Sequence, residues 1–285
     1  MRCLLSVLTL LVATCAFPAS VMADTAHCTA ITSLPTTLSS AGLYCINQDF
    51  AYGGVGPAIT ITADNVSVDL NGHTIRATRS PGDAEVSYQG VSVSGHKYFS
   101  IIDGTISGFT IAIFVSDTSK AVAEGGLIAN LQIVKSPNPM GIFCNGCIVR
   151  NNIVTDTHPL SSQNTDSAIA ILVDGIGNQV MGNHVFETVN GSAATLPGAA
   201  IEVDGSHSIA SNNYVSNTTL ATTTVLYGIR VSGTGMLVSD NQVQNLFYCY
   251  WLEASPTKYR NNLSSGCGEA FGGSGTPSGD LGGNN

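Results

Sequence analysis

The chain has 285 residues, of which 44% are apolar and only 10% are charged, and its formal net charge is −9. An apolar fraction of this size supports a large buried core and excludes a disordered protein. Ten lysines and arginines against 19 acidic residues provide no basic surface for phosphates, so nucleic acid is not an expected partner.

The first 23 residues have the layout of a secretory signal peptide. The basic Arg2 precedes an apolar run over residues 3–17, and the small residue Ala23 marks the expected cleavage site. A lipid anchor at Cys15 is the alternative. No later stretch reaches 18 uninterrupted apolar residues, so no integral membrane segment is expected. We therefore expect an exported protein, extracellular or periplasmic, that acts as a monomer.

Six of the eight cysteines remain after residue 23, and an even number in an exported chain is typical of disulfides. Six cysteines allow about fifteen pairings. A zinc site is the alternative at the two cysteines that are three residues apart, but no second pair of ligands lies nearby in the sequence. Proximity in the sequence favours Cys28 with Cys45, Cys144 with Cys147, and Cys249 with Cys267.

Two short blocks alternate along the chain from residue 58 to residue 263. The first has a small residue and then alternating apolar residues, as in Ala200-Ile201-Glu202-Val203. The second has a small or polar pair before an apolar residue, as in Asn212-Asn213-Tyr214-Val215. From the second copy on, successive first blocks are 21 to 30 residues apart. The first blocks begin at residues 58, 90, 112, 141, 170, 200, 228 and 249.

Strands of about four residues at this spacing cannot pair as hairpins, whereas stacked coils bury them. Each strand then pairs with its equivalent in the next coil, and the inward apolar residues form a continuous column. Asn tolerates a left-handed bend, and its amide can bond to the Asn of the next coil. The expected Asn ladder is Asn152, Asn183, Asn213, Asn241 and Asn261. The expected inward residues include Ile59, Val91, Ile113, Ile171, Val173, Ile201, Val203, Ile229 and Val231.

The stretch from Cys28 through Leu34-Pro35 and Tyr44-Cys45 to residue 75 resembles the capped first coil of exported proteins of the pectin-lyase-like superfamily. The resemblance covers about residues 28–267. It implies an all-β, right-handed parallel β-helix of about eight coils with three sheets per coil, in which ligands bind outside the first sheet. The expected organisation is a signal peptide at 1–23, a cap at 24–57, the β-helix at 58–267 and a Gly-rich flexible tail at 268–285.

Candidate catalytic residues lie on the outer side of the first blocks. Alternation sends Glu202 and Asp204 outward, and Arg230 is the counterpart of Glu202 one coil later. Asp174 and Asp204 occupy equivalent positions, so they could act as an acid and a base or supply oxygen ligands to Ca²⁺, the one cofactor considered. The alternatives are a structural ion pair between Glu202 and Arg230, and a turn-forming role for Asp174 and Asp204, whose position elsewhere carries Asn145.

Candidate substrate-binding residues are Arg230, Trp251, His184, Asp166 and His158. The triplet 164–166 is similar to a polygalacturonase motif, and the segment 228–231 is similar to their substrate-binding Arg segment. The departures matter more: the paired Asp is missing at 199–200, a Ser-His-Ser replaces the Gly-flanked His at 206–208, and neither the pectate-lyase arginines nor the alginate-epimerase Asp-Pro-His-Asp signature is present.

Three functions remain open. The first is a polysaccharide lyase, hydrolase or epimerase that works in a groove outside the first sheet, with carboxylates as general acid and base. The second is a non-catalytic glycan-binding surface module, in which Trp251 and Phe143 stack on sugars. The third is a structural solenoid without a small ligand. A polysaccharide or glycan is the expected partner.

Overall fold

A computed structural model describes residues 28–78, 88–116, 122–159, 167–194, 196–220, 225–253, 256–274 and 279–285. All regular structure within these ranges is β-strand, and every paired strand runs parallel to its neighbours. In the same ranges no helix is long and apolar enough to span a membrane. The predicted signal peptide lies outside the described residues.

The first sheet has ten strands, one from each coil, and contains the repeated first blocks. It carries the candidate site on its outer face. In order its strands are β2 (Thr36–Leu38), β5 (Ile59–Ile61), β8 (Gln89–Ser94), β10 (Ile111–Ser116), β12 (Met140–Phe143), β15 (Ile169–Ile176), β18 (Gly198–Ser206), β21 (Leu226–Val231), β24 (Tyr248–Leu252) and β27 (Glu269–Gly272).

A 17-stranded sheet forms the other two sides of the coil as two ladders, which merge where β9 (Ser100–Ser107) and β11 (Leu127–Val134) run through both. The second ladder also contains β1 (Thr29–Ile31), β3 (Gly42–Ile46), β6 (Val66–Asp69), β13 (Ile148–Arg150), β16 (Gln179–Met181), β19 (Ile209–Ser211), β22 (Leu237–Ser239) and β25 (Lys258–Arg260). The third ladder also contains β4 (Phe50–Tyr52), β7 (Thr74–Ala77), β14 (Ile153–Thr157), β17 (His184–Thr188), β20 (Tyr214–Ser216), β23 (Gln242–Gln244) and β26 (Leu263–Ser265).

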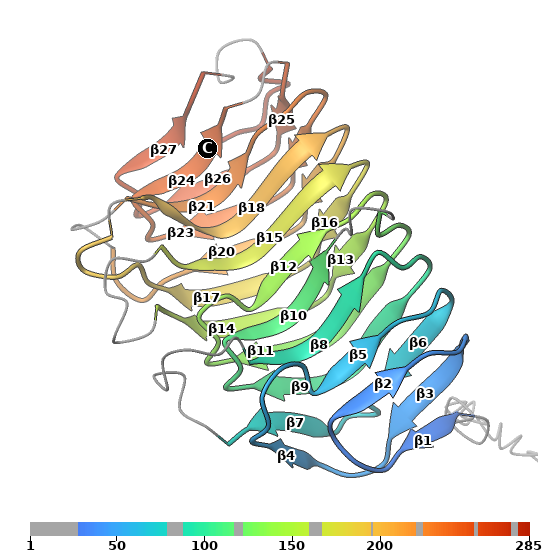
Figure 1. Ribbon diagram of the computed structural model, residues 1–285. Helices are drawn as coiled ribbons and strands as arrows, with labels where there is room; N and C mark the ends of the chain where they lie inside the picture. Colours follow the sequence, from blue (N-terminus) through green and yellow to red (C-terminus); the bar gives the residue numbers. More distant parts are fainter. Residues whose placement is uncertain are drawn as a thin grey trace, which may run out of the picture.

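The three ladders wind into one right-handed parallel β-helix, as Figure 1 shows. Strands of the first sheet run to the right across the front of the view while the chain climbs from the blue end to the red end. The chain is therefore an all-β parallel β-helix, as the sequence predicts.

The core is the column of inward side chains enclosed by the three ladders. All nine residues predicted to face inward are fully buried, so the predicted period-two register is confirmed. Small residues begin most of the first blocks because the inner corner is crowded. A Cβ on Gly228 would lie 2.2 Å from the Val243 side chain and 2.5 Å from the Cys249 carbonyl oxygen.

The Asn corner lies between the second and third ladders. Two adjacent residues have different roles in it. The first residue takes the left-handed backbone, as Asn212 does with φ of 55° and Asn261 with φ of 53°. The second is buried and forms the ladder, in which Asn213 Nδ2 donates to Asn241 Oδ1 at 3.0 Å. The prediction of Asn261 as a ladder member is wrong, because Asn262 holds that place. The ladder consists of Asn152, Asn183, Asn213, Asn241, Asn262 and Asn284.

Each end of the helix has one more coil than the eight copies of the repeat indicate. β2 adds a strand to the first sheet within the predicted cap, and β27 adds one within residues 268–285. The coils thus continue beyond Cys267, into the segment expected to be a tail. The three disulfides favoured by sequence proximity are confirmed: Cys28–Cys45, Cys144–Cys147 and Cys249–Cys267.

One repeat lies in a different register from the one its sequence indicates. Ile142 pairs with Val173, and Phe143 pairs with Asp174. Phe143, and not Asn145, therefore precedes Asp174 in the outward column, so the prediction for Asn145 is wrong. The local reason is that the β12 strand begins at Met140, which takes the inward place opposite Ile171.

Candidate functional site

One outward column of the first sheet crosses β15, β18, β21 and β24. In it Leu172 pairs with Glu202, Glu202 with Arg230, and Arg230 with Trp251. This is the column that alternation predicts, and parallel pairing places its side chains about 4.8 Å apart along the helix. The candidate catalytic Glu202 and the candidate binding residues Arg230 and Trp251 therefore lie side by side.

Arg230 lies between two carboxylates from neighbouring coils. Its Nη1 donates to Glu202 Oε1 at 2.5 Å, and its Nη2 donates to Glu253 Oε2 at 3.0 Å. The indole of Trp251 donates to the other oxygen of Glu253 at 2.7 Å. The predicted Glu202–Arg230 pair is confirmed, and Glu253 joins it as a third member that the sequence did not suggest.

The side chain of Glu202 is only 7% exposed, although it points away from the core column. Burial raises the pKa of Glu202 to about 7. The charge of Arg230 acts in the opposite direction, whereas the nearby Asp204 and Glu253 carboxylates raise this pKa further. Burial raises the pKa of Glu253 too, but hydrogen bonds from Arg230 and Trp251 outweigh it, so the pKa of Glu253 is lowered. The cluster thus holds two glutamates that favour different protonation states.

The two aspartates also meet as predicted. Asp174 pairs directly with Asp204 in the adjacent coil, and Ser232, one coil further, donates from its hydroxyl to Asp204 Oδ1 at 2.5 Å. Among the described residues no group of three or more His, Cys, Asp or Glu side chains is arranged to hold a metal ion. Within the described residues the Ca²⁺ hypothesis for Asp174 and Asp204 therefore gains no third carboxylate or histidine ligand.

A stack of aromatic rings borders the charged cluster, and two of its members were missed from the sequence. The ring of Tyr227 stacks on Trp251 with centroids 5.2 Å apart, and Tyr248 lies 4.7 Å from Trp251. Strict alternation would put Tyr227 on the same side as the buried Ile229. The small residue Gly228 faces inward between them, so the strand bends and the Tyr227 ring turns outward. A small residue at this point of the repeat is the signal that could have revealed the bend.

The remaining candidates lie apart from this cluster. His184 begins β17 in the third ladder, where its ring is 5.8 Å from that of Tyr214. His158 follows β14, and its Nε2 is 3.5 Å from Asp156 Oδ1. Asp166 lies outside the described residues. The structure therefore joins Asp174, Glu202, Asp204, Arg230 and Trp251, and it places His184 on another face.

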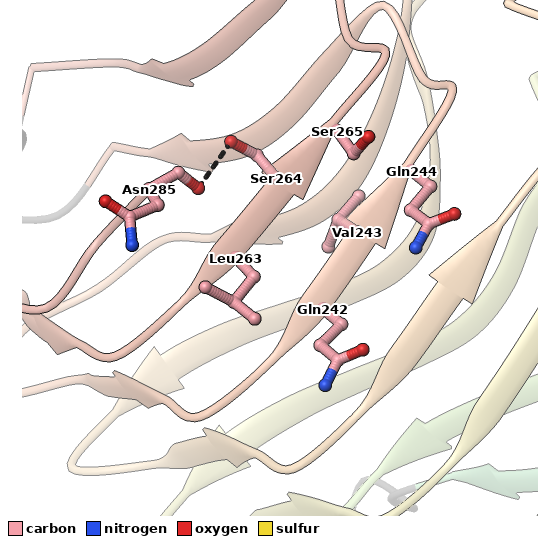
Figure 2. Close-up of a pocket in the computed structure, with 7 residues that line it drawn as sticks. All are labelled: Gln242, Val243, Gln244, Leu263, Ser264, Ser265 and Asn285. Carbon is pink, nitrogen blue, oxygen red and sulfur yellow. Dashed lines mark hydrogen bonds between the residues drawn. The ribbon is translucent and has the colours of Figure 1, made fainter.

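Two neighbouring hollows lie on the third ladder, away from Glu202, and a third of about 360 Å³ lies on the same ladder beside Asp49 and Arg76. One, of about 320 Å³, is lined by His184, Tyr214 and Gln242 among others. The second, of about 280 Å³, extends from Gln242 and Gln244 to Leu263 (Figure 2). Their lining contains no buried carboxyl, in contrast to the cluster around Glu202 on the first sheet.

The chain matches no protein-family model and no curated protein sequence. Among solved structures, the A-module of the *Azotobacter vinelandii* mannuronan C-5 epimerase AlgE6 is 14% identical, with a TM-score of 0.33 and coverage of 86% of this chain and 90% of that one. The AlgE4 A-module of the same organism is 10% identical, with a TM-score of 0.28 and coverage of 86% and 89%. The catalytic domain of a GH87 α-1,3-glucanase, in complex with nigerose, is 10% identical, with a TM-score of 0.30 and coverage of 86% and 63%. At these values the likeness says nothing about the residues of the site.

Proposed function

We propose that the protein is an exported enzyme that cleaves a neutral polysaccharide on the outer face of the first sheet, with Glu202 as the general acid. The observation that carries the proposal is a buried carboxyl with a pKa of about 7, held between Arg230 and Asp204 beside a stack of aromatic rings. Perturbed carboxyls of this kind concentrate at catalytic sites.

Glu202 and Asp204 divide the acid and base roles. A glutamate with a pKa of about 7 is protonated in about half of the molecules at neutral pH. The protonated form can donate its proton to a leaving glycosidic oxygen. Asp204 lies two residues along the same strand, on the same outer face, and accepts a hydrogen bond from the Ser232 hydroxyl, so it is the candidate base. Asp174 pairs with it in the next coil and is the alternative base.

The charges of the site favour a neutral glycan over a uronate polymer. Arg230 is the cation of the cluster, and its two terminal nitrogens are already bonded to Glu202 and Glu253. A uronate carboxylate would meet the aspartates and Glu253 without a free partner, which costs free energy. The half-buried rings of Tyr248 and Trp251 suit the apolar faces of sugar rings, and the buried ring of Tyr227 stacks on Trp251.

The same charges favour hydrolysis over elimination or C5 epimerisation. Elimination and C5 epimerisation both remove a proton beside a uronate carboxylate, and that step requires positive charge to stabilise the developing anion. Hydrolysis of a neutral glycosidic bond requires an acid and a carboxylate, which the cluster supplies. We therefore infer a glycoside hydrolase in preference to a lyase or an epimerase.

The test is the activity of the purified protein on a panel of neutral and anionic polysaccharides, assayed for new reducing ends and for unsaturated uronates. We expect reducing ends from a neutral polymer without unsaturated products. The double variant Asp174→Asn/Asp204→Asn should lose this activity while its unfolding temperature stays close to that of the wild type, because Asn keeps the turn chemistry. Unsaturated uronates, or full activity in the double variant, would contradict the proposal.

A second candidate is a glycan-binding protein without catalysis, and the aromatic stack of Tyr227, Tyr248 and Trp251 favours it. In that case Trp251→Ala would abolish binding to a neutral polysaccharide, while Glu202→Gln would leave both the binding and the polymer unchanged. Loss of reducing ends in Glu202→Gln with binding intact would instead support hydrolysis.

Export is supported by the signal-like first 23 residues and by three disulfides, which persist in oxidising compartments. The exported protein would then bind its polysaccharide outside the cytoplasm, in the periplasm or outside the cell.

A further inference from the structure

A second polar and aromatic surface lies on the outer face of the third ladder. One of its columns runs through His184, Tyr214, Gln242 and Leu263, each paired with the next. The neighbouring column contains Phe186, Ser216, Gln244 and Ser265. We call these eight residues the third-ladder strip. From β17 to β26 it spans three coil steps, about 14 Å at 4.8 Å per step.

The strip is hollowed along its length. The two hollows of about 320 Å³ and 280 Å³ share Gln242, so they are neighbours on one line parallel to the helix axis. Figure 2 shows the amides of Gln242 and Gln244 extending from β23 on the same side. A chain-like ligand that follows the axis would contact both hollows in turn.

The polar groups of the strip have no partners within the described residues. The side-chain amides of Gln242 and Gln244 and the hydroxyl of Tyr214 make no hydrogen bond to protein atoms there. This differs from the Asn ladder one corner away, where the amides from Asn152 to Asn262 each donate to the Asn of the next coil. Two unbonded amides and a hydroxyl on adjacent strands provide donors and acceptors for the hydroxyls of a ligand.

Aromatic rings complete the surface at one end. Tyr214 lies 5.6 Å from Phe186 and 5.8 Å from His184, measured between ring centroids. Phe186 and Tyr214 are half-buried and His184 is exposed, so ring surface remains open to solvent. Aromatic faces beside a few polar groups are the usual composition of a site for an organic ligand.

The charges of the third-ladder strip favour a neutral ligand over an anionic one. The strip contains no lysine, arginine or acidic residue, and the acidic Asp240 that lines its first hollow is bonded to Asn261 at 3.1 Å. With a formal net charge of −9 and no free cation in the strip, an anionic polymer is disfavoured.

We propose that the third-ladder strip binds a neutral polysaccharide chain that lies along the helix axis. It is separate from the cluster around Glu202, which occupies the outer face of a different sheet. Its role is to hold the polymer and not to cut it, so it exists whether or not the cluster on the first sheet is catalytic.

The test is affinity electrophoresis in native gels that contain hydroxyethyl cellulose, dextran or galactomannan, with polygalacturonate as the anionic comparison. We expect the wild type to be retarded in at least one neutral gel. Tyr214→Ala and Gln242→Ala/Gln244→Ala should each weaken the apparent affinity by about tenfold, as expected for losing one stacked ring or two hydrogen-bonding side chains. Gln132→Ala is the matched control, because Gln132 is an exposed glutamine of the same column outside both hollows.

The variant Gln242→Ala/Gln244→Ala changes only surface side chains. It therefore tests polysaccharide binding by the strip even if Tyr214→Ala fails to fold. Unchanged retardation in that variant would overturn the proposal, and so would retardation confined to the polygalacturonate gel or absent from every gel. Retardation lost in Trp251→Ala but kept in Gln242→Ala/Gln244→Ala would place binding on the first sheet and also overturn it.

Discussion

Two ion pairs of equal length join neighbouring coils in different parts of the helix. In the N-terminal coils Lys97 Nζ lies 2.5 Å from Glu124 Oε2, and both side chains are 42% exposed. In the C-terminal coils Arg230 lies 2.5 Å from Glu202, and the glutamate is 7% exposed. The glutamates therefore differ in their surroundings and not in the length of their ion pair.

This comparison separates a structural ion pair from a candidate catalytic one. Water screens the Lys97–Glu124 pair, so its contribution to folding and chemistry is small. At Glu202 burial and the Asp204 carboxylate act against Arg230 and raise the pKa to about 7. The same bond length thus accompanies a solvated charge in one place and a carboxyl that can hold its proton in the other.

The largest expected difference is in activity. On the polysaccharide that the wild type cleaves, Glu202→Gln should lower kcat by at least about 100-fold, because the amide cannot donate a proton to the leaving oxygen. Glu124→Gln removes the carboxylate of the exposed pair and should leave kcat unchanged. Initial rates of reducing-end formation provide the measurement.

Equal loss of activity in Glu202→Gln and Glu124→Gln would show that both ion pairs have only a structural role. Full activity in Glu202→Gln would remove this residue from the chemistry.

The second difference is in stability after loss of the cation. At pH 8 Arg230→Met should lower the free energy of unfolding by about 3 kcal/mol, because the buried Glu202 carboxylate loses its counter-ion. Lys97→Met should cause no resolvable change, because the exposed Glu124 carboxylate stays hydrated without its partner. Urea unfolding followed by circular dichroism compares the two variants, and similar losses would contradict the distinction.

The third difference is in the pH dependence of stability. The folded-state pKa of Glu202, about 7, exceeds the ordinary value of 4.5, so the folded protein binds this proton more tightly than the unfolded chain does. The stability that Glu202 contributes is therefore fully present below pH 4.5 and is lost as the pH rises through 7, by about 3 kcal/mol in total. Glu202→Gln should lack this loss, so its stability relative to the wild type should rise between pH 4 and pH 8. A constant difference between the two proteins would contradict the raised pKa.

The sequence predicted both the inward column of the core and the outward column of the charged cluster. Ile201 and Val203 flank Glu202 on one strand as Ile229 and Val231 flank Arg230 on the next, so a single register assigns Glu202 and Arg230 to adjacent outward places. The three disulfides followed from proximity in the chain. These features depend on local spacing, which a sequence displays directly.

The features that were missed depend on where the backbone bends. Tyr227 has the parity of an inward residue and reaches the site only because the strand turns at Gly228. Asn261 and Asn262 are identical side chains at a corner, and only the backbone geometry decides which one enters the ladder. The pKa of Glu202 depends on burial by neighbouring coils, which the spacing of residues does not express.

The most direct test of the account is a pH titration of the Glu202 carboxyl carbon by ¹³C NMR, with Glu202→Gln identifying its resonance. We expect a midpoint near pH 7, raised by burial and by Asp204. A midpoint at or below about 4.5, the ordinary range of a glutamate, would show that Arg230 keeps Glu202 ionised and would contradict its role as the general acid.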